Sequence, residues 1–97
     1  MYRIMIADDE GIVIDSFKFM LEEEFGDNIM IETAKTGRSV IELAERFRPD
    51  IGFMDIRMPG INGIDAIREI RKRNPGITFV VISAYDKFGY AQEAMSL

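Results

Sequence analysis

The stretch Tyr2-Arg3-Ile4-Met5-Ile6-Ala7-Asp8-Asp9-Glu10 is a short apolar run that ends abruptly in three acids. A second run of the same kind, Ile51-Gly52-Phe53-Met54, ends in Asp55. Apolar runs this short are typical of buried strands rather than of helices. If the two strands are parallel neighbours, their carboxyl ends lie at one edge of a sheet, where ligands bind in open α/β folds. The sequence therefore predicts that Asp8, Asp9 and Asp55 come together.

The rest of the chain alternates short apolar segments with amphipathic ones. We expect strands over residues 2–7, 29–34, 51–54 and 78–83, and helices over 11–25, from 36 or 37 to just before Pro49, over 62–73 and over 86–96. This alternation is the pattern of βαβ units and predicts an α/β fold with a doubly wound parallel sheet. In the first helix, apolar residues at helical spacing are expected to face the core: Val13, Phe17, Met20, Leu21 and Phe25.

Length and composition exclude several classes of protein. The 97 residues are expected to form one domain, residues 1–97. A net charge of −5 argues against a nonspecific nucleic-acid surface. The chain has no cysteine and no histidine, which excludes disulfides, thiolate metal sites and histidine-based catalysis within it. No apolar run approaches the roughly 20 residues of a membrane span, and the first strand leaves no room for a signal peptide. We therefore expect a cytoplasmic location and no membrane contact.

The three carboxylates indicate phosphoryl chemistry that depends on a metal ion. Like charges so close together are unfavourable unless a cation holds them or one is modified. Mg²⁺ suits such a cluster because it prefers oxygen ligands. Asp8 and Asp9 are the predicted ligands, and Arg57 could add its backbone carbonyl. Asp55 is the predicted nucleophile, since a carboxylate can attack phosphorus to give an acyl phosphate.

Each of these residues also has an ordinary structural interpretation. Asp8 or Asp9 could cap the following helix, where acids are favoured. Asp55 could be an exposed acid that caps the loop after its strand. Ser83, at the end of the fourth strand, could cap the next helix or place its hydroxyl beside the same pocket. The remaining surface features are expected to be structural, namely a solvated basic patch of Arg68, Arg71, Lys72 and Arg73, and two glycines, Gly60 and Gly63, that serve backbone geometry.

The combined motifs resemble the CheY-like receiver domain of two-component response regulators. They are Ile-Ala-Asp-Asp-Glu at 6–10, Met-Asp-Ile-Arg-Met-Pro-Gly at 54–60, Asn-Gly at 62–63 and Ile-Ser-Ala at 82–84. The segment 85–94 is similar to receivers that precede a helix-turn-helix transcription module. The resemblance implies a flavodoxin-like fold with strand order 2-1-3-4-5, of which this chain contains four of the usual five β/α units.

The resemblance also implies roles for individual residues. Asp55 accepts a phosphoryl group from the phosphohistidine of a sensor histidine kinase, while Asp8, Asp9, Asp55 and the carbonyl of Arg57 hold Mg²⁺. Ser83 matches the hydroxyl that senses the phosphoryl group. Such a domain catalyses its own phosphorylation and slow hydrolysis, so it is regulatory rather than a conventional enzyme, and it controls an output domain absent from this chain.

Two alternatives remain from the sequence. A phosphatase similar to the haloacid dehalogenases also uses an aspartyl phosphate, but its first-strand Asp-x-Asp spacing is absent from Asp8-Asp9-Glu10. Receivers carry a lysine on a fifth strand, and none of the lysines here occupies that position. The chain is therefore expected to be a receiver that stops short of its C-terminal unit, or a self-associating fragment without signalling activity. In the second case an exposed fourth strand would support a homodimer or strand exchange.

Overall fold

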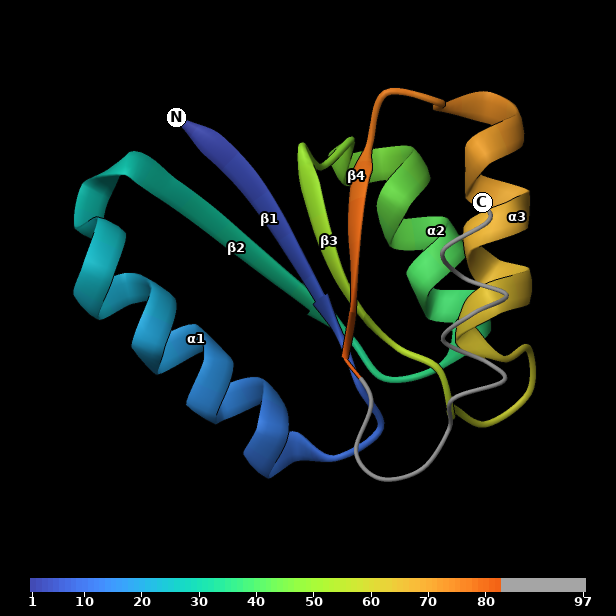
Figure 1. Ribbon diagram of the computed structural model, residues 1–97, viewed down its shortest axis with the longest axis horizontal. Helices are drawn as coiled ribbons and strands as arrows, with labels where there is room; N and C mark the ends of the chain where they lie inside the picture. The colour runs from blue at the N-terminus through green and yellow to red at the C-terminus, as the bar shows by residue number, and fades with distance from the viewer. Residues whose placement is uncertain (83–97) are drawn as a thin grey trace.

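The computed structural model describes residues 1–82, and within them four strands form one parallel sheet (Figure 1). The strands are β1 (Tyr2–Ala7), β2 (Ile29–Ala34), β3 (Ile51–Asp55) and β4 (Thr78–Ile82), and the helices are α1 (Gly11–Phe25), α2 (Gly37–Phe47) and α3 (Gly63–Arg73). The strand order is β2-β1-β3-β4, and every pairing is parallel. This confirms the predicted doubly wound α/β fold. The expected last helix, 86–96, lies outside the described residues.

Side-chain caps fix where α2 and α3 begin. The Oγ1 of Thr36 accepts the N–H of Ser39 at 3.1 Å, and the Oγ of Ser39 accepts the N–H of Thr36 at 3.1 Å. This reciprocal pair is a capping box. At the start of α3, Asn62 Oδ1 accepts the N–H of Asp65 at 2.9 Å. Both helices therefore start one residue after a side chain that satisfies a free N–H of the first turn.

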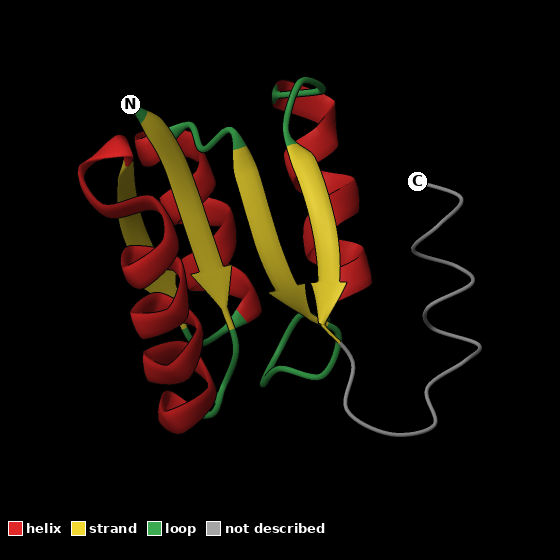
Figure 2. Cartoon of the chain, turned by 60° about the vertical axis from the view of Figure 1, so that its left-hand side comes forward, coloured by secondary structure: helices red, strands yellow, loops and turns green. Residues whose placement is uncertain are grey.

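The helices cover the two faces of the sheet unequally. In Figure 2, α1 lies on one side of the sheet and the other two helices lie on the opposite side. The side of α2 and α3 holds the larger core, which includes Met5, Val40, Leu43, Phe47, Met54, Ala66, Ile67, Ile70 and Ile77. The side of α1 holds a smaller cluster of Ile4, Ile6 and Ile14, with Phe17, Leu21, Ile29, Ile31 and Phe53 packed against it. None of the helices within residues 1–82 is both long and apolar enough to cross a lipid bilayer.

The predicted apolar stripe of α1 is only partly correct. Ile14 is buried, and the ring of Phe17 lies 5.6 Å from the ring of Phe53, measured between centroids. Met20 and Phe25, however, are 52% and 50% exposed. On this side α1 is the one helix that the described residues provide, so a narrow stripe of it contacts the sheet and its flanks stay in solvent.

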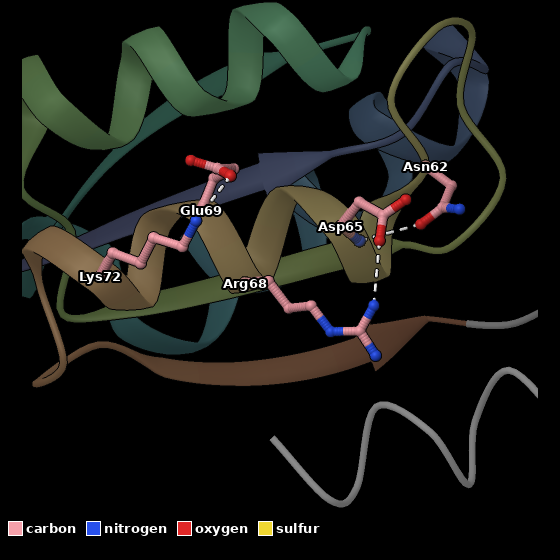
Figure 3. Close-up of polar contacts among 5 residues, drawn as sticks. All are labelled: Asn62, Asp65, Arg68, Glu69 and Lys72. Atoms are coloured by element: carbon pink, nitrogen blue, oxygen red, sulfur yellow. Dashed lines mark hydrogen bonds and ion pairs between the residues drawn. The ribbon is translucent and has the colours of Figure 1, made fainter.

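The basic patch at the end of α3 contains one residue that is not solvated. Arg71 is half-buried, and its Nη1 donates to the carbonyl oxygen of Pro75 at 2.8 Å and to that of Ile77. Its guanidinium lies 5.0 Å from the ring centroid of Phe79. Arg71 thus ties the end of α3 to the start of β4. The neighbouring charges behave as expected, since α3 carries the exposed ion pairs Arg68–Asp65 and Lys72–Glu69 (Figure 3).

Candidate functional site

Three carboxylates meet at the carboxyl edge of the sheet, as the sequence predicts. Ala7 is paired with Met54 across β1 and β3, so Asp8 and Asp55 directly follow paired residues on neighbouring strands. One carboxylate oxygen from each of Asp8, Asp9 and Asp55 lies within 4.8 Å of the other two. Parallel pairing brings Asp8 and Asp55 together, because adjacent strands are about 4.8 Å apart, and the turn between β1 and α1 adds Asp9.

Asp8 is the buried member of the group. Its side chain is 5% exposed, and its Oδ1 accepts the N–H of Glu10 at 2.8 Å. Its own N–H donates to the carbonyl oxygen of Ala34 at 3.1 Å, which continues the β1–β2 pairing by one residue. The residue that caps α1 is Glu10, and its side chain makes no capping hydrogen bond. The ordinary interpretation of Asp8 as a helix cap therefore does not describe its place in the structure.

The surroundings of Asp8 favour its protonated form. Burial is the main cause that raises the pKa of the Asp8 carboxyl above its ordinary value of 3.8. The hydrogen bond from the Glu10 backbone acts in the opposite direction, while the charges of Asp9 and Glu10 raise the pKa further. A carboxylate that is buried beside like charges is stabilised by a bound cation. The pKa of Asp8 therefore supports a cation site at this edge.

The loop after Asp55 folds back over the end of β3. The N–H of Arg57 donates to Asp55 Oδ1 at 3.2 Å, and the N–H of Gly63 donates to the carbonyl oxygen of Ile56 at 2.7 Å. A Cβ on Gly63 would overlap the carbonyl oxygen of Asp55, so only glycine allows this approach. The prediction that Gly63 serves backbone geometry is thus supported by its contact with the candidate nucleophile.

A second glycine holds the same loop from the side of α2. A Cβ on Gly37 would overlap the carbonyl oxygen of Ile61, and the N–H of Gly37 faces the carbonyl oxygen of Pro59 at 3.5 Å. Sequence reasoning missed this contact, because Gly37 looks like an ordinary first residue of a helix. The loop is therefore fixed at both ends, which restricts the backbone next to Asp55.

The other predicted site residues are placed less fully. Arg57 is exposed, and the structure gives its N–H a partner at Asp55, while the role of its carbonyl stays a prediction. Ser83 lies outside the described residues. One residue near the site was not predicted from the sequence. Lys35 places its Nζ 3.5 Å from the position that a Cβ on Gly11 would take. Its place directly after β2 was the available signal.

The site is chemically suited to a small, hard cation. Its three side-chain donors are all carboxylates, which Mg²⁺ and Ca²⁺ prefer over nitrogen or sulfur ligands. Asp9 is exposed and Asp55 half-buried, so the cluster is open to solvent on one side. A phosphoryl donor could approach from that side. The acid cluster therefore offers both a metal site and a carboxylate nucleophile.

Comparisons with known proteins agree with this geometry. A family model for the response regulator receiver domain matches residues 4–97. An uncharacterized transcriptional regulatory protein of Bacillus subtilis, YesN, is 35% identical over 95 residues, which cover 98% of this chain and 26% of that protein. The sensory transduction protein LytT of Oceanobacillus iheyensis is 34% identical over 89 residues, covering 90% of this chain and 36% of that protein. The chain thus spans between a quarter and two fifths of the length of these relatives.

Solved structures give the same result. The REC domain of AraT, a response regulator from Geobacillus stearothermophilus, has a TM-score of 0.85 and 34% identity, covering 98% of this chain and 74% of that one. The response regulator domain of Thermotoga maritima CheB has a TM-score of 0.86 and 26% identity, covering 99% and 72% of the two chains.

Proposed function

The chain belongs to the response regulator receiver domain family, and on that premise we propose that Asp55 accepts a phosphoryl group in a reaction that depends on Mg²⁺. Phosphoryl transfer and Mg²⁺ binding are general properties of receivers in two-component signalling. The observation that carries the proposal to these residues is that the carboxylate oxygens of Asp8, Asp9 and Asp55 lie within 4.8 Å of one another at the sheet edge. Residues 1–97 would form this one domain.

The chain's own residues have distinct roles in the proposed reaction. An oxygen of Asp55 forms a bond to phosphorus as the bond from phosphorus to the donor nitrogen breaks. The electron pair of that bond stays with the donor imidazole, which is protonated on its other nitrogen and leaves as the neutral ring. The N–H of Arg57 holds Asp55 Oδ1, and the fixed loop limits where the carboxylate can turn. The hydroxyl of Ser83 would donate a hydrogen bond to an oxygen of the attached phosphoryl group.

The acids beside Asp55 suit Mg²⁺. Asp8, Asp9, Asp55 and the backbone carbonyl of Arg57 would hold the ion. When bound, it supplies positive charge that offsets the charge on the transferring phosphoryl oxygens. Asp8 contributes because its buried carboxylate is already directed into the cluster by the hydrogen bond from Glu10.

We also propose partners and a location, on the basis of the family. Receivers act with histidine kinases and with output domains, and we propose a sensor histidine kinase as the phosphodonor of this chain. The relatives named as transcriptional regulators suggest an output domain that controls transcription. We place the domain in the cytoplasm, where such kinases present their phosphohistidine.

The first test is phosphorylation by a small phosphodonor. We expect the purified chain, incubated with acetyl phosphate and Mg²⁺, to gain the mass of one phosphoryl group, and we expect chelation of the metal to prevent the gain. Intact-mass spectrometry measures the product, and hydroxylamine should remove it because it is an acyl phosphate.

A matched pair of variants identifies the residue. Asp55→Asn should abolish the mass gain, whereas Asp27→Asn, at an exposed acid in the turn after α1, should leave it unchanged. Equal labelling of Asp55→Asn and wild type would assign the phosphoryl group to another residue and would overturn the proposed role of Asp55.

A second proposal concerns association, because one apolar residue of β4 is open to solvent. Val80 is 43% exposed, and β4 is paired with β3 alone among the described strands. We propose that two copies of the chain associate through β4. The proposal is compatible with phosphorylation, since Val80 lies in the middle of β4 and the acids lie at or just beyond the carboxyl ends of β1 and β3.

A further inference from the structure

A lysine stands in the same row as two of the acids. Ala7 is paired with Ala34 of β2 on one side and with Met54 of β3 on the other. The residues that follow these three are Asp8, Lys35 and Asp55, so the row runs Lys35, Asp8, Asp55 across neighbouring strands. Neighbouring strands are about 4.8 Å apart, which places the Lys35 backbone roughly 5 Å from that of Asp8 and 10 Å from that of Asp55.

Strand alternation places all three on one side of the sheet. Ile6, Ile31 and Phe53 belong to the cluster under α1. Residues separated by two or four positions share a side of a strand, so Asp8, Lys35 and Asp55 follow on this same side. The Lys35 ammonium agrees with that placement, because it lies against Gly11, the first residue of α1.

Within residues 1–82 the Lys35 ammonium has no structural partner. It forms no ion pair or hydrogen bond with any residue in the part of the chain that the structure describes, although Asp8, Asp9 and Glu10 follow β1 close by. Lys35 is exposed, and a cation at the start of a helix is unfavourable for the helix dipole. Neither helix stability nor an ion pair with any of residues 1–82 therefore explains its position, and we take the charge to be available to an anionic ligand.

We propose that Lys35 is a positioning residue that attracts the anionic phosphodonor to the open side of the acid cluster. The inference rests on the proposed function, because it concerns the donor for Asp55. An acid cluster repels a phosphoryl donor, and a neighbouring cation reduces that repulsion as the donor approaches. The same cation repels Mg²⁺. Lys35 therefore favours the donor and disfavours the metal, and these opposite effects distinguish it from a structural residue.

The expected effects are modest because the interactions cross several ångströms at the protein surface. Removing the charge with Lys35→Gln should raise the KM for acetyl phosphate by roughly two- to fivefold at low ionic strength, without changing the rate at saturation. The Kd for Mg²⁺ should fall by a similar factor. Both differences should disappear near 1 M salt, where the screening length is about 3 Å.

The experiment compares variants of the full chain by two measurements. Mg²⁺ affinity is measured by titration of amide NMR shifts, without any phosphodonor. The KM and the maximal rate are measured from the acetyl phosphate dependence of the mass gain. Lys35→Arg, which keeps the charge, should restore both values, and Lys35→Glu should exceed the effects of Lys35→Gln. Lys18→Gln, at an exposed lysine in the middle of α1, is the matched control and should match wild type.

The possible results separate this inference from the proposed function. Wild-type activity and Mg²⁺ binding together with an unchanged Lys35→Gln variant would overturn the role of Lys35 alone. Weaker binding of both Mg²⁺ and donor in Lys35→Gln would indicate a structural defect and would also overturn it. A wild-type chain that neither binds Mg²⁺ nor gains a phosphoryl group would overturn both proposals.

Discussion

Asp8 is the residue on which stability and function make opposite demands. Its carboxyl is buried beside two other acids, and burial raises its pKa. Between the unfolded value of 3.8 and the higher folded pKa, the native state binds more protons than the unfolded state. The free energy of unfolding therefore falls as the pH rises through this window, and above it the full cost of the charge is present. A bound cation would offset that cost.

We expect Asp8→Asn to stabilise the metal-free protein at pH 7 by roughly 1 kcal/mol, the usual size of a stabilising substitution at a strained functional site. The amide oxygen can still accept the N–H of Glu10, while the buried charge is gone. The gain should shrink as the pH falls and should vanish below about 3.8, where Asp8 of the wild type is protonated in both states. Urea unfolding at a series of pH values in the presence of a chelator measures it.

Mg²⁺ should reverse the order of stability, so that wild type becomes more stable than Asp8→Asn. At a concentration 100 times the Kd, Mg²⁺ is expected to stabilise wild type by about 2.7 kcal/mol and Asp8→Asn by much less. If Asp8→Asn were less stable than wild type in the chelator at pH 7, the Asp8 carboxylate would stabilise the metal-free fold. That result would contradict the prediction.

At the scale of elements, the sequence predicted what depends on local pattern. The bounds of β1, β2 and α1 agree with the structure, because acids follow β1, a glycine follows α1 and an asparagine precedes β2. The meeting of Asp8, Asp9 and Asp55 was predictable, since parallel pairing brings Asp8 and Asp55 together and Asp9 is next to Asp8 in the chain. Contacts between separate loops were not predictable. Gly37 and the loop at Ile61 are far apart in sequence, and no local pattern records their approach.

Sequence reasoning also failed where burial depends on tertiary contacts, as at Met20, Phe25 and Arg71. Helical spacing marks the side of α1 that can face a core, but the width of the buried stripe depends on what lies opposite. A basic residue near a helix end is usually solvated, yet the turn after α3 brings two carbonyl groups within reach of Arg71.

The loop after β3 provides the element-scale prediction. Gly63→Ala should destabilise the protein by about 1–3 kcal/mol, because its methyl group would overlap the carbonyl oxygen of Asp55 and the backbone would have to move. Mg²⁺ affinity should fall with it. Gly76→Ala is the control, since a Cβ there would make only ordinary van der Waals contact, 3.8 Å from Asn74 Oδ1. Urea unfolding and a Mg²⁺ titration of both variants measure the effects, and equal behaviour of the two would contradict the close approach.

At the scale of the whole molecule, the two sides of the sheet differ in how well they are covered. The side of α1 has an apolar cleft lined by residues that include Tyr2, Ile4, Leu21, Phe25 and Phe53. Val80 is paired with Phe53 and stays 43% exposed. Apolar surface next to a strand edge that no other described strand pairs with favours association with another chain.

We therefore expect the mass of the wild-type chain to rise with concentration in sedimentation equilibrium. Val80→Lys should keep the chain monomeric, because a lysine on an edge strand opposes pairing. Phe19→Lys replaces an apolar residue on α1 that is even more exposed, at 66%, and should leave association intact. A wild-type chain that remains monomeric at high concentration would contradict association through β4.

The contact between Gly63 and Asp55 has a mechanical consequence. The first turn of α3 rests on the carbonyl oxygen of Asp55, with no side chain between them to absorb a displacement. The helix has 11 residues, about 16 Å of stiff rod. A small tilt at its start would become a larger sweep at its far end, as at the tip of a lever. Arg71 ties that end of the helix to the chain entering β4, because it donates to the carbonyl oxygens of Pro75 and Ile77. A tilt that starts at Asp55 would therefore be passed along α3 to the start of β4.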